Sequence, residues 1–222
     1  MKISLKFLSV LISVFMIETA QSQDWPNLSR FAAANDLLGL PTADEKRVVF
    51  MGNSITEGWL LNDSLTFFQE NGYINRGIGG QTTPQMLVRF RQDVIDLKPA
   101  VVVILAGIND IAGNTGPSTL KMIMNNIESM AELARSNHIQ VIISSVLPAL
   151  DFPWSRGLEP ARKVIKLNKM LKEYCTRQQY HYLDYFSYMV DDQNGLKAEY
   201  TYDGVHPNKA GYEVMGPLAK AA

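Results

Sequence analysis

Short apolar runs rich in β-branched residues recur along the chain, separated by longer amphipathic stretches. This alternation is typical of βαβ units. Because the runs are nearly continuous in apolar residues, they indicate strands covered on both faces, as in a parallel sheet. The sequence predicts at least five strands: Arg47 to Met51, Tyr73 to Arg76, Val101 to Ala106, Gln140 to Leu147 and Tyr180 to Phe186.

The stretches between these runs carry helical periodicity. From Leu120 to Ala134, apolar residues and methionines fall at spacings of three and four, which predicts an amphipathic helix whose methionine side belongs to the core. Pro117 and Ser118 precede it as the expected cap. Right-handed crossovers of this length place helices on both faces of an open sheet. The other expected helices are Pro84 to Leu97, Glu159 to Arg177, Lys209 to Ala221 and a short one after Ser54.

Length and charge narrow the class of protein. At 222 residues the chain suits one sizeable domain, which we place at residues 23–222. The formal net charge of -1 is spread along the sequence, so there is no basic patch of the kind that binds nucleic acid. A neutral or mildly polar small substrate fits this balance better.

The first 22 residues have the layout of a signal peptide. Lys2 and Lys6 precede an apolar run from Phe7 to Ile17, and the small residues Ala20 and Ser22 follow it. The run is too short to span a bilayer, so we expect export to the periplasm or medium without stable membrane insertion. No cysteine lies near the junction to carry a lipid.

The predicted strands end in residues that can carry chemistry, and ligands of open α/β sheets bind at those ends. The first strand runs into Gly52-Asn53-Ser54-Ile55-Thr56, which places Ser54 at a strand-to-helix turn. A serine at such a turn is either a nucleophile or the N-cap of the helix, because serine is a preferred cap residue. The turn by itself leaves both interpretations open.

Two further strand ends offer hydrogen-bond donors. The second ends in Gly77-Ile78-Gly79-Gly80-Gln81-Thr82, where the glycines expose backbone N–H groups, as an oxyanion hole or a simple tight turn would. The pattern is neither a dinucleotide fingerprint nor a P-loop. The third strand delivers Asn109, whose amide is a donor or an ordinary turn residue.

A histidine and a carboxylate lie close together before the last expected helix. Asp203 stands three residues before His206, and a carboxylate at that spacing can orient the imidazole that serine catalysis requires. The other histidines, His138 and His181, lie at the approaches to strands. Metal binding by Asp203 and His206 is the alternative, although no third and fourth ligand stands at a typical spacing.

Taken in order, these blocks resemble the SGNH, or GDSL-like, hydrolases. The matching segments are Gly52-Asn53-Ser54-Ile55, Gly79-Gly80-Gln81-Thr82, Gly107-Ile108-Asn109-Asp110 and Asp203-Gly204-Val205-His206. The resemblance implies a three-layer α/β/α, flavodoxin-like fold with a five-stranded parallel sheet of order 2-1-3-4-5. It also implies acyl transfer to water without a metal or cofactor.

The same resemblance assigns roles to residues. Ser54 would be the nucleophile, His206 its base and Asp203 the group that orients His206. The backbone N–H groups of Ser54 and Gly80 and the side-chain amide of Asn109 would form the oxyanion hole. Many members carry Asp before the nucleophile where this chain has Asn53, so we expect the turn to survive without the charge of that carboxylate.

Only the branch of the family indicates which substrates to expect. Residues 77–83 resemble the platelet-activating-factor acetylhydrolase-like branch, and its exported bacterial relatives resemble carbohydrate O-deacetylases, which favours a short acyl ester on a sugar. Trp154 is a candidate to stack on that sugar, or else a surface anchor for its loop. A lysophospholipase or thioesterase is the alternative with the same mechanism. A catalytically idle carbohydrate-binding module is the alternative of another class.

Overall fold

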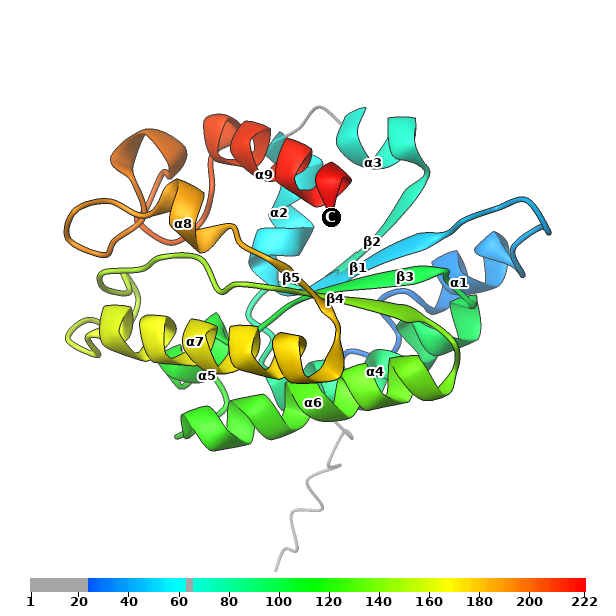
Figure 1. Cartoon of the computed structure of the whole chain (residues 1–222), viewed down its shortest axis with the longest axis horizontal. Coiled ribbons are helices and arrows are strands. Elements are labelled where there is room, and N and C mark those ends of the chain that lie inside the picture. The colour runs from blue at the N-terminus through cyan, green and yellow to red at the C-terminus, as the bar shows by residue number, and fades with distance from the viewer. Residues whose placement is uncertain (1–23, 63–65) are drawn as a thin grey trace, which may run out of the picture.

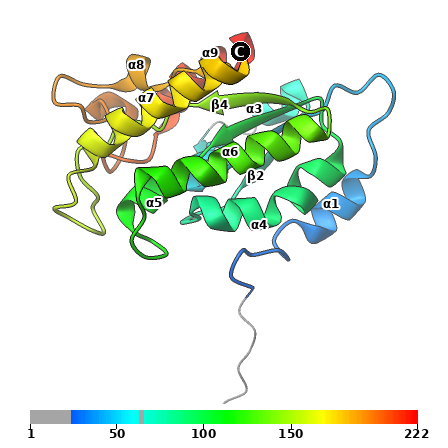
Figure 2. The same cartoon turned by 60° about the horizontal axis from the view of Figure 1, so that its bottom comes forward.

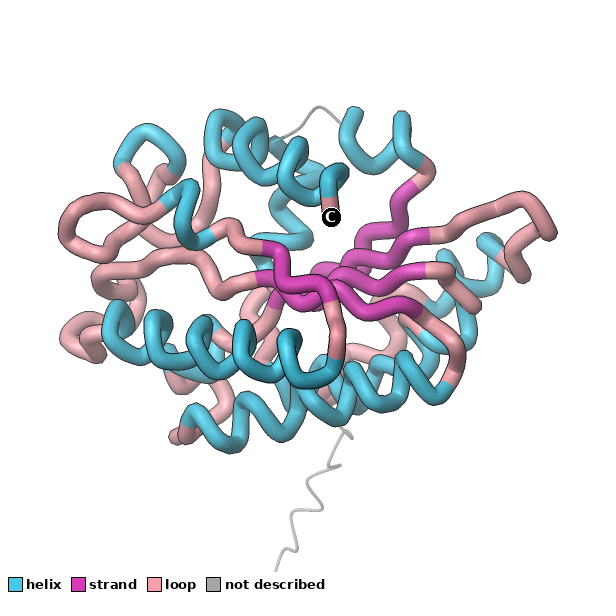
Figure 3. The backbone as a smooth tube through the Cα atoms, in the orientation of Figure 1, coloured by secondary structure: helices cyan, strands magenta, loops and turns pink. Residues whose placement is uncertain are grey.

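The computed structural model describes residues 24–62 and 66–222. The expected signal peptide, residues 1–22, lies outside them. At the centre is a five-stranded sheet of order β2-β1-β3-β4-β5 in which every pairing is parallel, so the predicted fold class and strand order are confirmed (Figure 1; Figure 3). The strands are β1 (Val48–Gly52), β2 (Tyr73–Gly77), β3 (Val101–Leu105), β4 (Gln140–Ser144) and β5 (His181–Leu183).

Helices cover both faces of the sheet and make it the middle of three layers (Figure 1). One face carries α2 (Ser54–Asn62), α3 (Thr66–Asn71) and α9 (Lys209–Ala221), with the short α8 (Phe186–Met189) packed on α9. Figure 2 shows the other layer, in which α4, α6 and α7 lie side by side. Its helices are α1 (Ala32–Leu38), α4 (Thr83–Asp93), α5 (Ile108–Ala112), α6 (Leu120–Ser136) and α7 (Pro160–Gln178).

The register of the strands brings three turns to the same level. Gly52, the last residue of β1, is paired with Gly77 at the end of β2 and with Leu105 at the end of β3. The chain therefore leaves all three strands at one edge of the sheet. This common edge lets residues that are far apart in the sequence share one site.

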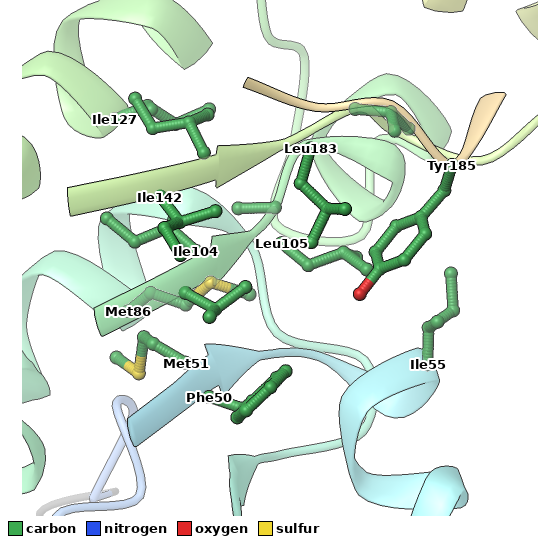
Figure 4. Packing of buried hydrophobic residues seen from close by; sticks show 14 of the residues in the cluster. Phe50, Met51, Ile55, Met86, Ile104, Leu105, Ile127, Ile142, Leu183 and Tyr185 are labelled. Atoms are coloured by element: carbon green, nitrogen blue, oxygen red, sulfur yellow. The ribbon is translucent and has the colours of Figure 1, made fainter. Parts of the chain in front are cut away.

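The core is built from the strands and from the apolar sides of the helices, as Figure 4 shows. The methionine side of α6 belongs to it, as predicted, because Met124 and Met130 are buried together with Ile123 and Ile127. Burying a side chain of this size contributes about 1.5–3 kcal/mol. The cap of α6 is Thr119 rather than Pro117 or Ser118, since the Thr119 hydroxyl accepts a hydrogen bond from Met122 N–H.

An aromatic cluster joins α9 to α2 on the face of the sheet that carries these two helices. The indole of Trp59 stacks on Phe67 and on Tyr212, with ring centroids 4.5 and 5.3 Å apart. The hydroxyl of Tyr212 also donates a 2.8 Å hydrogen bond to the carbonyl of Ile55, in the first turn of α2. The loop before α9 is thereby anchored beside the turn that ends β1.

Several predicted bounds were too long. The expected strand to Leu147 ends at Ser144, because the side-chain amide of Asn168 on α7 pairs with both the N–H and the C=O of Val146. The strand expected to reach Phe186 ends at Leu183, where α8 follows after a short turn. The helix expected to reach Leu97 ends at Asp93 and is followed by the 3₁₀ helix η1 (Ile95–Leu97); a second, η2 (Ala198–Tyr200), precedes the loop before α9.

Candidate active site

The turn after β1 is held by Asn53. Its side-chain oxygen accepts a 3.0 Å hydrogen bond from the N–H of Ile55, and its carbonyl accepts one from the N–H of Glu57, so Asn53 is the N-cap of α2. Ser54 is the first residue of the helix, and the interpretation of Ser54 as an N-cap is wrong. A Cβ on Gly52 would lie 2.0 Å from the hydroxyl oxygen of Thr56, which requires glycine there. The turn is formed with Asn at position 53, as expected.

The hydroxyl of Ser54 points to a histidine from the other end of the chain. Its Oγ lies 2.9 Å from Nε2 of His206, a residue 152 positions away. The other ring nitrogen of His206, Nδ1, lies 2.7 Å from Oδ2 of Asp203. The structure thus brings Ser54, His206 and Asp203 into one hydrogen-bonded row.

The loop that carries Asp203 and His206 is folded around the carboxylate. Oδ1 of Asp203 accepts hydrogen bonds from the backbone N–H groups of Val205 and His206, at 2.9 and 2.7 Å. The hydroxyl of Thr201 donates to the carbonyl of His206 and accepts from the N–H of Gly204. The loop is therefore ordered by its own side chains, and Thr201 is a residue that the sequence analysis missed.

These hydrogen bonds also set the charge of Asp203. Partial burial alone would raise the pKa of its carboxyl group. Hydrogen bonds from the N–H and the ring of His206, and from the N–H of Val205, outweigh this effect and hold the pKa below its ordinary value of 3.8. The carboxylate is therefore ionised near neutral pH, as a group that stabilises an imidazolium must be.

The glycine loop after β2 lies against the same turn. A Cβ built on Gly79 would be 3.8 Å from the Cβ of Ser54. Gly80 is exposed and has a φ of +75°, a left-handed conformation that favours glycine. Asn109, at the start of α5, is buried, and its Nδ2 donates a 3.0 Å hydrogen bond to the carbonyl of Gln81. An amide nitrogen carries two hydrogens, so one donor of Asn109 remains for another acceptor.

A buried ion pair lies beneath these two turns. Arg89 and Asp93 on α4 are fully buried and 3.0 Å apart. Nη2 of Arg89 donates to the carbonyls of Gly52 and Arg76, near the ends of β1 and β2, and its Nε donates to the side chain of Gln81. Arg89 therefore ties the turn after β1 to the glycine loop. The sequence analysis missed this pair, whose only signal is the i, i+4 spacing in a predicted helix.

The sequence matches a known protein family over most of its length. Residues 50–214 match the model of the GDSL-like Lipase/Acylhydrolase family. The chain belongs to this family. The resemblance seen in the sequence is therefore confirmed, and the expectation of an ester hydrolase is confirmed at the level of the family.

This GDSL-like hydrolase is similar to several solved structures of bacterial proteins. It is 51% identical to a candidate acylhydrolase from Bacteroides fragilis, with a TM-score of 0.88 over 90% of this chain and 96% of that one. A GDSL-like lipase from Bacteroides thetaiotaomicron is 48% identical, with a TM-score of 0.87 over 89% and 97% of the two chains. A variant of Axe2, an acetylxylan esterase from Geobacillus stearothermophilus, is 18% identical with a TM-score of 0.65 over 81% and 94%, a likeness of fold.

One curated relative matches over a shorter stretch. It is the uncharacterized lipoprotein YqeF of Bacillus subtilis (strain 168), 36% identical over 81 residues, or 35% of this GDSL-like hydrolase. The chain covers only 33% of that relative's length. Across residues 24–62 and 66–222, no helix has the length and apolarity needed to cross a membrane.

Two exposed aromatic rings flank His206 in the hydrolase. The ring of Tyr202 stacks on the imidazole, 5.8 Å away with an interplanar angle of 10°, and Trp154 lies 5.8 Å from it at 40°. The indole of Trp154 is 46% exposed and stacks in turn on the buried ring of Phe152. The structure therefore places Trp154 next to His206, and it adds Tyr202, which the sequence analysis did not single out as a site residue.

Metal binding by Asp203 and His206 would need further ligands, and the described part of the chain offers none beside them. Within residues 24–62 and 66–222, no group of three or more His, Cys, Asp or Glu side chains could hold a metal ion. The carboxylate of Asp203 is hydrogen-bonded to His206 and Val205, within its own loop. The arrangement suits proton transfer between Ser54 and His206.

Proposed function

We propose that this GDSL-like hydrolase is a serine esterase that removes acetyl or other short acyl groups from carbohydrate, through a Ser54–His206–Asp203 triad. The observation that carries the proposal is the hydrogen-bonded row from Ser54 Oγ to His206 Nε2 and from His206 Nδ1 to Asp203 Oδ2. Nucleophile, base and orienting carboxylate in this order are what acyl transfer through a serine requires.

The reaction would proceed in two balanced steps. Ser54 Oγ attacks the acyl carbon while Nε2 of His206 takes its proton, and the carbonyl oxygen becomes an oxyanion. Collapse of this intermediate breaks the bond to the sugar oxygen, which receives the proton from His206 and leaves as an alcohol. Water then attacks the acyl-enzyme with His206 as base, releasing the carboxylic acid and restoring Ser54. Asp203 keeps Nδ1 of His206 protonated and balances the imidazolium.

The oxyanion would be held by donors at the ends of β1, β2 and β3. They are the backbone N–H groups of Ser54 and Gly80 and the remaining N–H of the Asn109 amide. The two backbone groups belong to the turns after β1 and β2, and the Asn109 amide is held by its hydrogen bond to Gln81, so the donors would need little rearrangement during the reaction. We assign no metal or cofactor to the proposed reaction.

A sugar ester suits the surroundings better than a lipid ester. A hollow of about 340 Å³ borders the triad on the side of Asp203 and Gly204, and neither Ser54 nor His206 lines it. Beside apolar residues such as Leu150 and Leu196, its wall includes the charged side chains of Asp151, Arg156 and Asp191. Hydroxyl groups can hydrogen-bond to such a wall, whereas an acyl chain would leave these charges desolvated. The exposed ring of Trp154 beside His206 offers a stacking surface for a pyranose.

The first experiment measures hydrolysis of p-nitrophenyl acetate by wild type, Ser54→Ala and His206→Ala, with and without a chelator. We expect turnover in wild type, loss of at least 10³-fold in both variants as is typical for triad residues, and no effect of the chelator. Equal rates in wild type and Ser54→Ala would reject the mechanism and favour the idle binding module. The control Ser187→Ala removes a hydroxyl that bonds only to Asp184 in the described structure and leaves the rate unchanged.

A second experiment separates sugar from lipid. Rates are compared on acetylated xylooligosaccharides, on p-nitrophenyl octanoate and on a lysophospholipid. We expect the acetylated sugar to be preferred, and Trp154→Ala to lower kcat/KM for it by about 5- to 10-fold, which corresponds to roughly 1 kcal/mol of stacking. The same variant leaves p-nitrophenyl acetate hydrolysis within twofold. A preference for octanoate or lysophospholipid would support the lipid alternative.

We also propose that residues 1–22 direct export and are removed. The basic start, the apolar run and the small residues before position 23 support this. Mass spectrometry of the protein recovered from periplasm and medium tests it: an N-terminus at Gln23 or Gln21 is expected, and an intact N-terminus in the cytoplasmic fraction would contradict it.

A further inference from the structure

The peptide that presents the Gly80 N–H is held from both sides. On one side, the N–H of Gly79 donates a 2.8 Å hydrogen bond to Oε2 of Glu57. On the other side, the carbonyl of Gly80 accepts a 3.1 Å hydrogen bond from the side-chain amide of Asn114. The N–H between these two contacts is the one that the proposed mechanism assigns to the oxyanion. Its direction therefore depends on the two side chains that hold its neighbours.

Glu57 is built into the helix that carries the nucleophile. It lies in the first turn of α2, three residues after Ser54. The end of β2 packs directly on that turn, because a Cβ on Gly77 would lie 2.2 Å from the backbone nitrogen of Glu57. The carboxylate therefore connects the nucleophile turn to the glycine loop through a short, rigid path. A displacement of the side chain would be transmitted to Gly79 and Gly80.

A carboxylate at this position has an electrostatic disadvantage, and the structure compensates for it. Negative charge beside an oxyanion hole opposes the charge that develops there. The guanidinium of Arg30 lies 3.1 Å from the other carboxylate oxygen of Glu57, Oε1. The two side chains are 51% and 33% exposed, so salt in the solvent can screen the pair.

Arg30 is brought to Glu57 by the segment that precedes α1. Three glutamine side chains donate to backbone carbonyls of this segment, at 2.6–2.7 Å. The donors are Gln81, Gln85 and Gln92, and the acceptors are Pro26, Trp25 and Leu28. The segment is thus attached to the glycine loop and to α4, and it supplies the positive charge from outside the sheet.

We propose that Glu57 is a positioning residue that orients the Gly79–Gly80 peptides for the oxyanion, and that Arg30 neutralises its charge. The inference rests on the proposed esterase function. It predicts that the length of the side chain at position 57 matters more than its charge, provided that Arg30 is present. A purely structural role for Glu57 would change stability and leave the chemical step unaltered.

The test compares variants of the protein expressed from the whole chain. Glu57→Asp keeps the charge, but its side chain is one methylene shorter and no longer reaches the N–H of Gly79. Glu57→Gln keeps the length of the side chain and an oxygen that can accept this hydrogen bond. We expect Glu57→Asp to lower kcat for p-nitrophenyl acetate by about 10- to 100-fold with KM within threefold, since losing one oxyanion donor costs about 10²- to 10³-fold. Glu57→Gln stays within about threefold of wild type. Glu173→Asp and Glu173→Gln, on the exposed pair with Lys169, are the controls.

Two further measurements test whether these variants act on the stabilisation of the oxyanion. The inhibition constant of benzeneboronic acid, which forms a tetrahedral adduct with a serine nucleophile, rises in Glu57→Asp by the factor by which kcat falls. Arg30→Gln lowers kcat about three- to tenfold at 20 mM salt, and 0.5 M salt restores most of the loss because the Debye length shrinks.

The outcomes separate this inference from the proposed function. An inactive Ser54→Ala together with unchanged kcat in Glu57→Asp overturns the inference and leaves the esterase mechanism standing. Equal losses in Glu57→Gln and Glu57→Asp also overturn it, because length would then not be the deciding property. If Glu57→Asp does not fold, the kcat of Arg30→Gln at low salt is the deciding measurement. A value equal to that of wild type overturns the inference. Full activity of Ser54→Ala removes the proposed function itself.

Discussion

Replacing Asp203 by asparagine changes one atom and tests the orientation of His206. In wild type, Oδ1 accepts from two backbone N–H groups and Oδ2 faces Nδ1 of His206. The amide of Asp203→Asn has one oxygen, and the two backbone donors hold it at the Oδ1 position. The NH₂ group must then face Nδ1 of His206, which has to become an acceptor.

The consequence is the wrong tautomer of the imidazole. With Nδ1 unprotonated, the neutral ring carries its proton on Nε2, which then donates to Ser54 Oγ across the 2.9 Å contact and cannot act as base. The corresponding change in a serine protease lowers kcat by about 10⁴-fold, or about 5 kcal/mol, and we expect a loss of that size here. The loop keeps both backbone hydrogen bonds, so exchanging charged for neutral contacts lowers stability by only about 1–2 kcal/mol.

The assay is the hydrolysis of p-nitrophenyl acetate at pH 8, with thermal unfolding measured on the same samples. We expect Tm to fall by about 2–8 °C, at roughly 2–4 °C per kcal/mol for a chain of this size. Asp184→Asn is the control, since Asp184 also accepts from a backbone N–H and a hydroxyl, both from Ser187, and should leave kcat unchanged. A variant Asp203→Asn that retains a tenth of wild-type kcat/KM with native stability would refute the reasoning.

Three other predictions concern Asn109, the buried pair of Arg89 and Asp93, and the pKa of Asp203. Asn109→Ala removes the proposed side-chain donor to the oxyanion and is expected to lower kcat by about 10²- to 10³-fold in the p-nitrophenyl acetate assay, with KM little changed. Arg89→Ala removes the ion-pair partner of the fully buried Asp93, whose carboxylate keeps only a hydrogen bond from Asn35 within the described residues, and is expected to lower the free energy of unfolding by about 3–5 kcal/mol, measured by urea denaturation; a loss below 1 kcal/mol would contradict this. Because the pKa of Asp203 is lower in the folded chain than its ordinary 3.8, its ionised form stabilises the fold above about pH 4, and this contribution is lost as the pH falls through the folded pKa. Stability measured between pH 5 and 2.5 should therefore decline less in Asp203→Asn than in wild type.

The central architecture was accessible from the sequence because it rests on local patterns. A buried parallel strand is apolar along its whole length, so the apolar run from Val101 to Leu105 predicts β3 without any tertiary information. The bounds of α9 were predicted to the residue, since Asn208 caps it and its apolar spacing is regular. The ends of β4 and β5 were predicted too long, because the apolar residues that follow them are also buried, and burial alone does not distinguish a strand from a covered loop.

The small helices were harder to find. The short α1, α3, α5 and α8 were not predicted, since four to seven residues are too few to show a helical period. Within the site, Ser54 and Asn53 illustrate the same limit. Both residue types are good caps, and only the contact of Asn53 with Ile55 and of Ser54 with His206 assigns the cap to one and the hydroxyl to the other.

The sequence by itself determined the order of strands and helices, the residue types at the strand ends and, through their resemblance to a family, the class of reaction. Tertiary structure alone decided which of these groups meet. Ser54 and His206 are 152 residues apart in the sequence, and α9, which follows the loop of His206, is joined to α2 by the hydrogen bond of Tyr212 to Ile55. Glu57, Arg30 and Arg89 act through contacts of that kind, which leave no periodic signal because each involves one residue and a distant backbone or carboxylate group. Local patterns report which face of an element is buried; the partners of a polar side chain are set by the packing of whole elements.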